Sequence, residues 1–444
     1  MTRLSGIIAA TILASGGAAL NLDVKDPASI KEAAAQVAKG LFVYHDPSST
    51  AGQFTQPQPW FWWLSGSAWN GLMDYTVYTG DTTYQADILS AISKNLGANY
   101  DFAPAEQSSW EANDDQAYWV YNALTAMEYD FEALPCEKSE TNTVGDCANS
   151  WLAIATHAFE DFVARWNKDS ATCAGGLKWQ YTATASGYYY KNSVSNGGFF
   201  QTAARLARYT GNETYGDWAE KIWGWTTSVG FVSSDFRVFD GAGDNGDANC
   251  TAVNEDQWTY NIAAFLHGAA HMYAYTNSST WESRVQGLVG AAQKSFFGPT
   301  DAAPDVMYEQ KCELDSSCNV DQTSFKASLA RWLGKTAVLV PSVKDSIQTL
   351  LEASAKGAAS SCSGYDNSTC GIQWYTNGFD GQSDLGVELS SLEIIQSLLA
   401  ASAPKGPNLG ANRRGLGTSG GFSASNLVTC ILSFLFSLLS WLSV

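Results

Sequence analysis

One turn recurs along the chain and decides its fold: Tyr78-Thr79-Gly80-Asp81-Thr82-Thr83-Tyr84. A close copy is Tyr209-Thr210-Gly211-Asn212-Glu213-Thr214-Tyr215, and a looser copy is Tyr275-Thr276-Asn277-Ser278-Ser279-Thr280-Trp281. Each copy follows an apolar helical run and precedes an amphipathic one. Gly or Asn is typical of a helix end, and Asp, Asn, Ser or Thr is typical of the next helix start. The recurrence therefore predicts repeated helical hairpins.

Two kinds of helical run alternate along the chain. Apolar runs rich in small residues begin near Ser65, Asp114, Gly197, Glu255, Asp321 and Leu385. More charged amphipathic runs lie near Pro27–Phe42, Thr82–Leu96, Ser150–Trp166, Tyr215–Thr227, Thr280–Phe296 and Val343–Ala355. A helix that is apolar all round is buried, whereas an amphipathic helix covers a core with one face. The pattern predicts an all-α fold, an (α/α)6 barrel of six helical hairpins, with end loops at Leu134–Cys147 and Ser233–Val253.

The two ends of the chain indicate export and attachment to a membrane. Residues 1–19 resemble a secretory signal peptide, with Arg3 before a short apolar core and small residues after it. Residues 427–444 form a hydrophobic tail behind a flexible tether, residues 403–426. This arrangement is typical of a glycosylphosphatidylinositol (GPI) signal, whose tail is removed. Residues 20–402 are then the (α/α)6 domain, and we expect it at the outer face of the plasma membrane.

The cysteines and glycosylation sequons agree with an exported chain. Outside the tail the cysteines are Cys136, Cys147, Cys173, Cys250, Cys312, Cys318, Cys362 and Cys370. An even number indicates disulfides. Short spacings favour Cys136–Cys147, Cys312–Cys318 and Cys362–Cys370, which leaves Cys173–Cys250. Asparagines that head N-x-S/T sequons are Asn212, Asn249, Asn277 and Asn367.

The composition argues against several classes of function. A net charge of −19 repels nucleic acid. The four histidines are dispersed, apart from His267 and His271, and these lack the Glu of an H-E-x-x-H zinc motif. The stretch Asp240–Asp247 looks like a calcium loop but does not have EF-hand spacing, so we favour an ordinary loop there. We expect no cofactor, no metal and a monomer.

A second recurring pattern is Asn-x-Asp-Gln, found at Asn113–Gln116, Asn254–Gln257 and Asn319–Gln322. Asn is a good helix N-cap, and Gln three residues later completes a capping box. Acidic residues in the first turn complement the helix dipole. Capping therefore explains most of each copy, but it does not require Asp114. Only the first copy has an Asp at this variable position.

The functional interpretation places these helix starts at one mouth of the barrel, where their carboxylates ring a pocket. Asp114 and Asp115 are adjacent and stand among the aromatic residues Trp110, Tyr118 and Trp119. Glycoside hydrolysis typically uses two carboxyl groups, one ionised and one protonated. Mutual repulsion raises one pKa of such a pair, while helix N–H groups keep the other group ionised. Aromatic faces stack on sugars, although they also fill cores.

Two other clusters open predicted inner helices. Trp60-Phe61-Trp62-Trp63 precedes the first, and Trp63 can be part of a core plug or of a sugar platform. Ser195-Asn196-Gly197-Gly198 opens the third, and Asn196 can face the pocket or only cap the helix.

Several motifs together resemble glycoside hydrolase family 76, the α-1,6-mannanases. They are Asn113-Asp114-Asp115-Gln116-Ala117-Tyr118-Trp119, Tyr190-Lys191-Asn192, Asn196-Gly197-Gly198, Ala204–Asn212, Asn254–Trp258 and Gln322–Lys326. The resemblance runs from about residue 26 to residue 400. With the two terminal signals, the chain resembles the fungal GPI-anchored cell-wall branch of this family.

The resemblance implies an (α/α)6 barrel and a retaining mechanism. Asp114 would be the nucleophile and Asp115 the general acid/base. Asp256 would line the mannose subsite, with Glu255, Trp110 and Trp119 beside it. The substrates would be α-mannosides, including the mannose core of GPI anchors, and a wall polysaccharide would accept the transferred glycan. Simple hydrolysis of α-1,6-mannan and non-catalytic mannan binding are the alternatives.

Overall fold

The computed structural model describes residues 19–55, 61–107, 109–136, 147–246, 248–365 and 368–404. The predicted signal peptide lies outside this range except for its last residue. So do the hydrophobic tail and all of the tether beyond Pro404.

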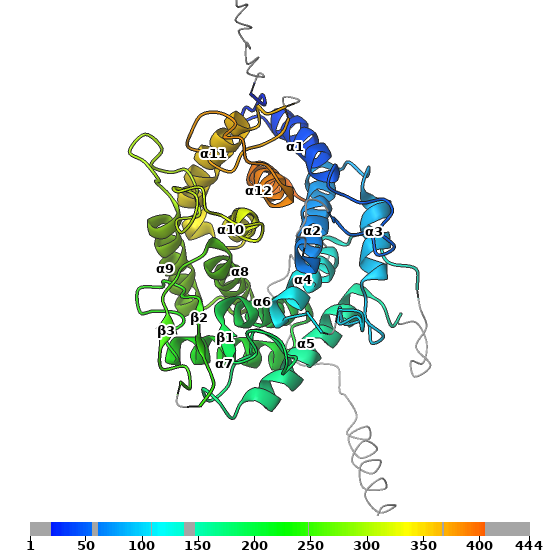
Figure 1. Ribbon diagram of the computed structural model, residues 1–444, viewed down its shortest axis with the longest axis vertical. Helices are drawn as coiled ribbons and strands as arrows, with labels where there is room; N and C mark the ends of the chain where they lie inside the picture. The colour runs from blue at the N-terminus through cyan, green and yellow to red at the C-terminus, as the bar shows by residue number, and fades with distance from the viewer. Residues whose placement is uncertain are drawn as a thin grey trace, which may run out of the picture. The chain divides into compact units, whose positions relative to one another are not determined.

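Twelve α-helices of the described chain form two concentric rings, as the sequence predicted (Figure 1). The inner helices are α2 (Trp62–Thr79), α4 (Asn113–Tyr129), α6 (Ser193–Thr210), α8 (Thr259–Thr276), α10 (Phe325–Leu339) and α12 (Leu385–Gln396). The outer helices are α1 (Pro27–Phe42), α3 (Gln85–Lys94), α5 (Trp151–Asp169), α7 (Glu213–Ser228), α9 (Ser279–Phe296) and α11 (Lys344–Ser361). Each inner helix packs against the next and α12 packs against α2, so the inner ring is closed. The fold is an (α/α)6 barrel.

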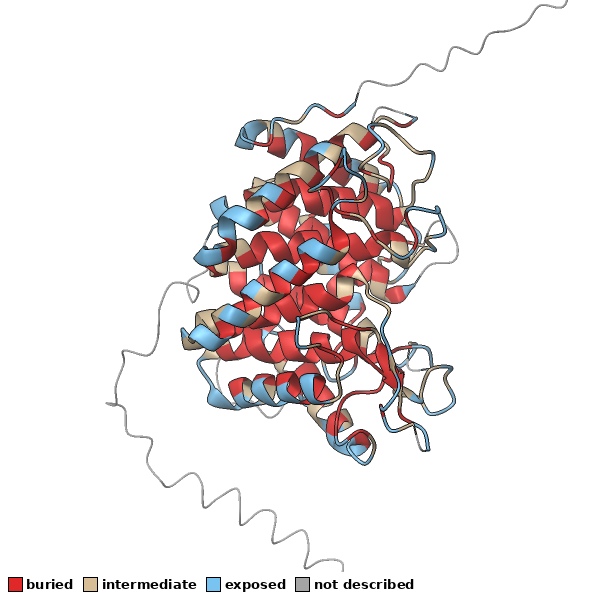
Figure 2. Cartoon of the chain, turned by 90° about the vertical axis from the view of Figure 1, so that its left-hand side faces the viewer, coloured by how far each residue is buried: buried red, intermediate tan, exposed pale blue. Residues whose placement is uncertain are grey.

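Burial separates the two rings as the composition predicted (Figure 2). Inner helices are buried on nearly every side, whereas outer helices bury one face and expose charged residues on the other. The stretch Leu385–Ser402 is long and apolar enough to cross a membrane, but 83% of it is buried inside the barrel. It joins α12 to the 3-10 helix η3 (Ser397–Ser402) and serves as a core element.

The recurring turns join inner to outer helices as predicted. Gly80, Gly211 and Asn277 each end an inner helix in the left-handed conformation. Asn212 and Ser278 then cap α7 and α9 with their side chains. The first copy differs, because α3 begins only at Gln85 and no side chain caps it.

The structure also contains a small antiparallel sheet that the sequence did not predict. Strand β2 (Gly241–Gly243) pairs with β1 (Tyr190–Asn192) and with β3 (Val253–Asn254). The stretch Ser233–Val253 is therefore only partly irregular. Strands of two or three residues are too short to show an apolar alternation in the sequence, so their pairing depends on tertiary contacts. Only the two ends of the other predicted loop, Leu134–Cys147, are described.

The cysteines pair as their spacings favoured: Cys136–Cys147, Cys173–Cys250, Cys312–Cys318 and Cys362–Cys370. Of the sequon asparagines, Asn212, Asn249 and Asn277 are exposed, and Asn367 lies outside the described residues.

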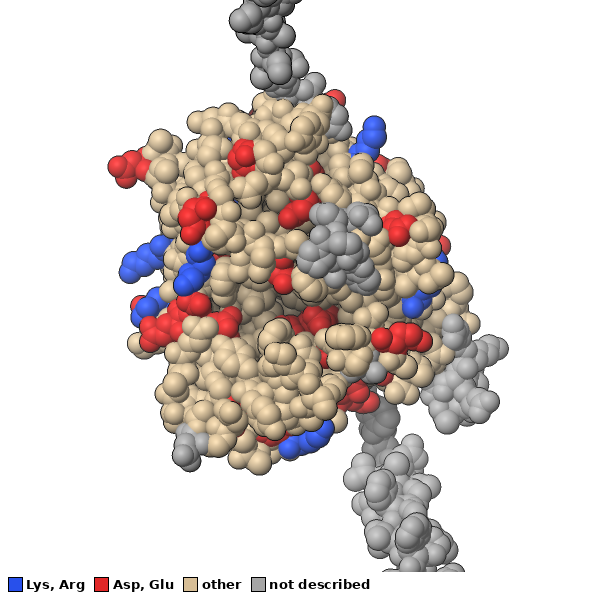
Figure 3. Space-filling model, viewed as in Figure 1, with Lys and Arg blue, Asp and Glu red and all other residues tan. Residues whose placement is uncertain are grey.

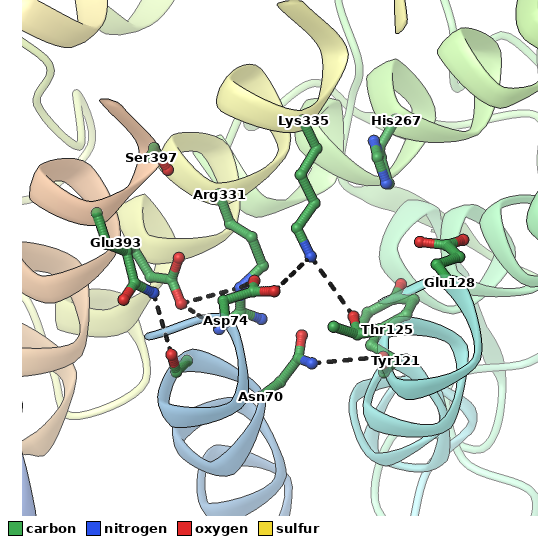
Figure 4. Close-up of polar contacts among 12 residues, drawn as sticks. Asn70, Asp74, Tyr121, Thr125, Glu128, His267, Arg331, Lys335, Glu393 and Ser397 are labelled. Carbon is green, nitrogen blue, oxygen red and sulfur yellow. Dashed lines mark hydrogen bonds and ion pairs between the residues drawn. The ribbon is translucent and has the colours of Figure 1, made fainter. Parts of the chain in front are cut away.

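A network of buried charges lies between the inner helices, mainly in their C-terminal halves (Figure 4). Arg331 of α10 bonds Glu393 of α12 at 2.6 Å and reaches Asp74 of α2 at 3.5 Å. Lys335 bonds Asp74 at 2.8 Å. Nearby, Arg205 of α6 bonds Glu128 of α4 at 2.7 Å. Three cations thus oppose three carboxylates, and five of the six inner helices contribute.

Removing one partner of this network is expected to destabilise the barrel strongly. Asp74→Ala would leave Lys335 without its carboxylate partner in a buried environment, a change that typically costs about 3–5 kcal/mol. Lys25→Ala is the matched control, because Lys25 is exposed and pairs with Glu352 at the surface. Such pairs contribute about 0–1 kcal/mol. Urea denaturation of the full chain measures both, and equal losses would contradict a special role for the network of buried charges.

Candidate active site

A cavity of about 860 Å³ opens where the N-terminal ends of the inner helices converge. In Figure 3 this face is hollowed near its middle, and acidic side chains gather there. The lining residues are Phe61, Trp62, Trp63, Gln107, Trp110, Glu111, Asp114, Asp115, Tyr118, Trp179, Gln180, Gly187, Tyr190, Asn192, Asp240, Tyr260, Asp321 and Phe325. Five of them are carboxylates, and none of the described lining residues is Lys, Arg or His.

Asp114 and Asp115 lie in the first turn of α4, at the cavity wall. Asp115 Oδ2 accepts a hydrogen bond from the Ala112 backbone N–H at 2.8 Å, which caps the helix. Asp114 Oδ1 accepts from the Asp115 N–H at 3.2 Å, and Asp114 Oδ2 accepts from Asn192 Nδ2 at 3.4 Å. Helix N–H groups therefore hold both carboxyl groups in fixed and different orientations.

The surroundings keep protons on these two groups at higher pH than usual. Burial raises the pKa of Asp114 to about 7, and the hydrogen bonds from Asn192 and from the backbone offset only part of this effect. Burial, and next the charge of Asp114, raise the pKa of Asp115 well above its ordinary value. When one carboxyl group of such a pair is ionised, the other favours its protonated form. The pair can therefore supply one carboxylate and one acid at neutral pH.

Three further carboxyl groups surround the pair. Asp321, before α10, accepts a hydrogen bond from Trp63 Nε1 at 3.1 Å, and burial raises its pKa to about 6. Asp240 accepts from the Tyr190 hydroxyl at 2.8 Å, and burial raises its pKa as well. Burial raises the pKa of Glu111 to about 8. The cavity is therefore acidic in composition, and part of its charge is neutralised by protons.

Aromatic rings form much of the remaining wall. Trp63 packs against Tyr118 with ring centres 4.7 Å apart. Tyr260 stacks on Phe325 at 3.9 Å with nearly parallel planes. Flat apolar walls beside hydrogen-bonding carboxylates suit a ligand that has both C–H faces and hydroxyl groups.

Four of the predicted site residues line this cavity, namely Asp114, Asp115, Trp110 and Trp63. Trp119 does not, because it is fully buried and stacks on Trp62 behind the wall. Asn196 neither faces the cavity nor caps α6. Its amide bonds the backbone of Leu177 through both Oδ1 and Nδ2, at 2.8 and 3.0 Å.

Asp256 and Glu255 also lie outside the cavity lining, contrary to the sequence prediction. The second Asn-x-Asp-Gln copy does not begin a helix, because α8 starts only at Thr259. Asn254 belongs to strand β3, and Asp256 pairs with the partly exposed Lys311 at 2.6 Å. The strand pairing therefore holds this segment extended and moves the helix start to Thr259.

In the third copy the reciprocal hydrogen bonds of a capping box form, but Asn319 is the N-cap neither of the 3-10 helix η1 (Gln322–Ser324) nor of α10. There Asn319 and Gln322 exchange two side-chain hydrogen bonds with each other's backbone N–H, at 2.9 and 3.0 Å. In the first copy Asp115 supplies the cap, and Asn113 donates to the Lys178 carbonyl at 2.9 Å. Gln116 donates to the Asp101 carbonyl at 2.7 Å, so it ties the helix start to a neighbouring loop.

The structure shows no group of three potential metal ligands among the described residues. His267 and His271 are buried in α8, and burial lowers the pKa of each well below its usual value. In the calcium-like loop, Asp240 faces the cavity and Asp244 bonds Lys178, so the two carboxylates point to different partners. Asp247 lies outside the described residues.

Sequence reasoning did not assign Asp240, Asn192 and Trp179 to the cavity, and it placed Asp321 there only as the carboxylate of the third motif copy. Asp321 had a signal, since it occupies the third motif copy just before an inner helix. Asn192 belonged to a quoted motif but had no assigned role. Asp240 and Trp179 lie in loops without periodicity, so only the folded arrangement brings them to the cavity.

Comparison with known proteins identifies the family of this chain. A family model described as glycosyl hydrolase family 76 matches residues 29–408. The chain belongs to this family. Its (α/α)6 barrel is thus the fold of a glycoside hydrolase family.

Similarity to individual proteins supports the same family assignment. The chain is 39% identical over 405 residues to the mannan endo-1,6-alpha-mannosidase DCW1 of Saccharomyces cerevisiae, covering 90% of this chain and 85% of that protein. Dfg5 from Chaetomium thermophilum, crystallised with glucosamine, matches with a TM-score of 0.79 and 32% identity over 92% of this chain and 99% of that chain.

A more distant structure has the same fold. It is an inactive variant of an alpha-1,6-mannanase from Salegentibacter sp., with two consecutive aspartates changed to asparagine and alpha-1,6-mannotriose bound. Its TM-score is 0.63 at 18% identity, and the match covers 83% of this chain and 99% of that chain.

The raised pKa of Asp115 predicts a pH-dependent stability change on its replacement. Below the ordinary value of 3.8, both folded and unfolded chains hold the proton, and as pH rises above it only the folded chain does. The native carboxyl therefore costs stability as pH rises toward its folded pKa. Asp115→Asn keeps an oxygen for the cap, and we expect its Tm to exceed the native value by about 1–3 °C at pH 7, with a smaller gain at pH 4.

Asp235→Asn is the control for this measurement. Asp235 is exposed, and its hydrogen bond with Ser233 lowers its pKa, so its replacement should not raise Tm at pH 7. Differential scanning calorimetry measures the Tm of both variants and of the native chain. An unchanged Tm for Asp115→Asn at pH 7 would contradict the raised pKa.

Proposed function

We propose that this chain is a retaining α-mannosidase-type transglycosylase that acts on α-1,6-linked mannosides. The observation that carries the proposal is the Asp114–Asp115 pair, the sole consecutive aspartates in the sequence, at the wall of an aromatic cavity. Two supports come from relatives. One of them is named a mannan endo-1,6-alpha-mannosidase, and the mannanase that is inactive lacks two consecutive aspartates.

In the first step the ionised Asp114 carboxylate attacks the anomeric carbon of the mannoside. A carbon–oxygen bond forms to Asp114 while the glycosidic carbon–oxygen bond breaks. Asp115 gives its proton to the departing glycosidic oxygen, and a covalent mannosyl-enzyme remains. The Asn192 amide, which donates to Asp114 Oδ2, orients the nucleophile.

In the second step a hydroxyl group of an acceptor replaces Asp114 at the anomeric carbon. The Asp115 carboxylate takes the hydroxyl proton, so both carboxyl groups return to their starting states. Two displacements retain the anomeric configuration. An acceptor sugar makes the reaction a transfer, and water makes it a hydrolysis.

The cavity favours neutral or cationic glycans over anionic ones. Its described lining has five carboxyl groups and no basic side chain, so an acidic polysaccharide would meet like charges. Glucosamine, which is bound in the Dfg5 crystal structure, carries an amine. These points support the GPI-anchor core glycan as donor, with a cell-wall polysaccharide as acceptor.

The proposed setting is the fungal cell surface. A signal peptide at residues 1–19 and a GPI signal at residues 427–444 would bring the enzyme to the outer face of the plasma membrane. There it would cross-link GPI-anchored glycoproteins to wall polysaccharide. The relatives' names support a mannosidase of fungi, and the cross-linking role is our proposal.

Loss of either aspartate tests the assignment. With α-1,6-mannotetraose as substrate, we expect Asp114→Ala to reduce kcat by about 10⁴-fold, because no covalent intermediate forms. Asp115→Ala should reduce it by about 10²–10⁴-fold, because the leaving oxygen lacks its acid. Added azide should restore turnover to these variants in part, with the anomeric form of the product showing which group was lost.

Asp235→Asn, an exposed aspartate far along the chain, is the control and should keep native turnover. Circular dichroism checks that the variants fold. Full activity in both Asp114→Ala and Asp115→Ala would reject a catalytic pair. Free mannosides in the same yield with and without an acceptor glycan would favour simple hydrolysis, and glycan binding without native turnover would favour a binding protein.

The pH dependence of kcat/KM gives a separate prediction. Catalysis requires Asp114 ionised and Asp115 protonated, so activity rises as Asp114 loses its proton and falls as Asp115 does. The profile should be bell-shaped, with an acid limb near the raised Asp114 pKa, about 7, instead of the ordinary aspartate range. Steady-state rates over the pH range test this, and an acid limb at about pH 4 would contradict it.

A further inference from the structure

Two tryptophans at the cavity mouth expose unusually large apolar surfaces. Trp110 is 77% exposed and Trp179 is 37% exposed, and both line the cavity. Indole rings are normally buried or placed where they bind a partner. The two rings therefore mark the mouth as a binding surface for flat apolar faces.

This surface is built rigidly. The segments carrying the two rings pair through an antiparallel bridge between Ala112 and Gln180. The Asn113 N–H donates to the Trp179 carbonyl at 3.0 Å, and the Trp179 N–H donates to the Tyr190 carbonyl at 2.7 Å. The first bond ties the segment that carries Trp179 to α4, and the second ties this segment to strand β1.

The indole of Trp179 also rests on a glycine that no other residue can replace easily. Gly187 has φ +90°, and a Cβ there would lie 2.3 Å from Trp179 Cε3. The ring thus packs directly on the backbone and is held in place before any ligand arrives. A pre-ordered ring loses little entropy on binding.

Gln180, which follows Trp179 in the chain, supplies a polar group to the same cavity wall. It lines the cavity, is only 9% exposed, and its Oε1 has no hydrogen-bond partner among the described residues. A buried acceptor without a partner is costly to leave unpaired. A ligand hydroxyl that donates to it would remove that cost.

The segment that carries Trp179 and Gln180 pairs with the residue whose N–H binds the Asp115 carboxyl group. Asp115 Oδ2 is bound by the Ala112 N–H, and Ala112 is the residue that bridges to Gln180. Asp114 instead contacts Asn192 at the start of α6. A general acid/base protonates the leaving oxygen and deprotonates the acceptor hydroxyl, so both of these sugars bind on its side.

We propose that Trp110, Trp179 and Gln180 form one subsite that holds the leaving sugar and then the acceptor sugar. The ligand class is a neutral polyhydroxyl glycan, whose C–H faces stack on the indoles and whose hydroxyl donates to Gln180. The inference rests on the proposed function, because it uses Asp115 as the acid/base.

The first measurement uses full-length chain with α-1,6-mannotetraose as both donor and acceptor. Mass spectrometry gives the ratio of products longer than the tetrasaccharide to shorter hydrolysis products. We expect Trp110→Ala, Trp179→Ala and Gln180→Ala each to lower this ratio about 10-fold, because water then competes better with a weakly held acceptor. Trp179→Phe should restore part of the ratio. Trp110 is exposed, so its variant tests the subsite even if Trp179→Ala folds poorly.

The second measurement is binding without turnover. In the Asp114→Asn background, each of the three alanine variants should raise the Kd for α-1,6-mannotetraose about 10-fold by calorimetry. Tyr365→Ala is the matched control, since Tyr365 is an exposed aromatic that contacts Phe379 outside the cavity lining. It should change neither quantity.

The outcomes separate this proposal from the function on which it rests. An unchanged Kd and an unchanged product ratio in all three alanine variants overturn the subsite. If the native chain forms only hydrolysis products, the transfer activity is rejected, and the Kd values alone then decide the subsite, which would hold the leaving sugar.

Discussion

The ion pairs that Arg331 makes with Glu393 and Asp74 are the contacts on which the barrel depends. They join α12, the last inner helix, to α2, the first, so they close the ring between segments at opposite ends of the domain. The approach of these helices leaves no space for a side chain at Gly71, where a Cβ would lie 2.7 Å from Leu389 Cδ1. Buried charges need partners, so this network is stable only when all its helices are in place.

This closure also determines where chemistry can occur. Paired charges lie between the inner helices, mainly in their C-terminal halves, and the cavity lies at their N-terminal ends. Helix N-termini carry partial positive charge and free N–H groups, which can hold carboxylates in a partly buried site. Asp115 is an example, because the same carboxyl group caps α4 and faces the cavity. Helix capping and the proposed acid/base role therefore share one residue, and the raised pKa values are the physical cost of that arrangement.

Much of the fold could be predicted because its signals are local. The turns around Gly80, Gly211 and Asn277 and the apolar or amphipathic character of each run need no distant contacts to be recognised. The helix starts were less predictable. Asn254–Gln257 resembles a capped helix start, but pairing of β3 with β2 holds this segment extended, so the helix begins later. Cavity residues from loops, such as Trp179 and Asp240, were not predictable because no period connects them to the barrel.

Local signals were enough to predict the alternation of twelve helices, the cysteine pairs favoured by short spacings, and the pair of adjacent aspartates at a helix start. These follow from periodicity, turn chemistry and spacing, which act over a few residues. The folded arrangement was needed to show which acidic residues share a cavity, that Asp256 and Glu255 are not in its lining, and that Trp110, Trp179 and Gln180 are. The reason is that ring closure brings together helix starts and loops far apart in the chain, and a sequence pattern carries no information about that distance.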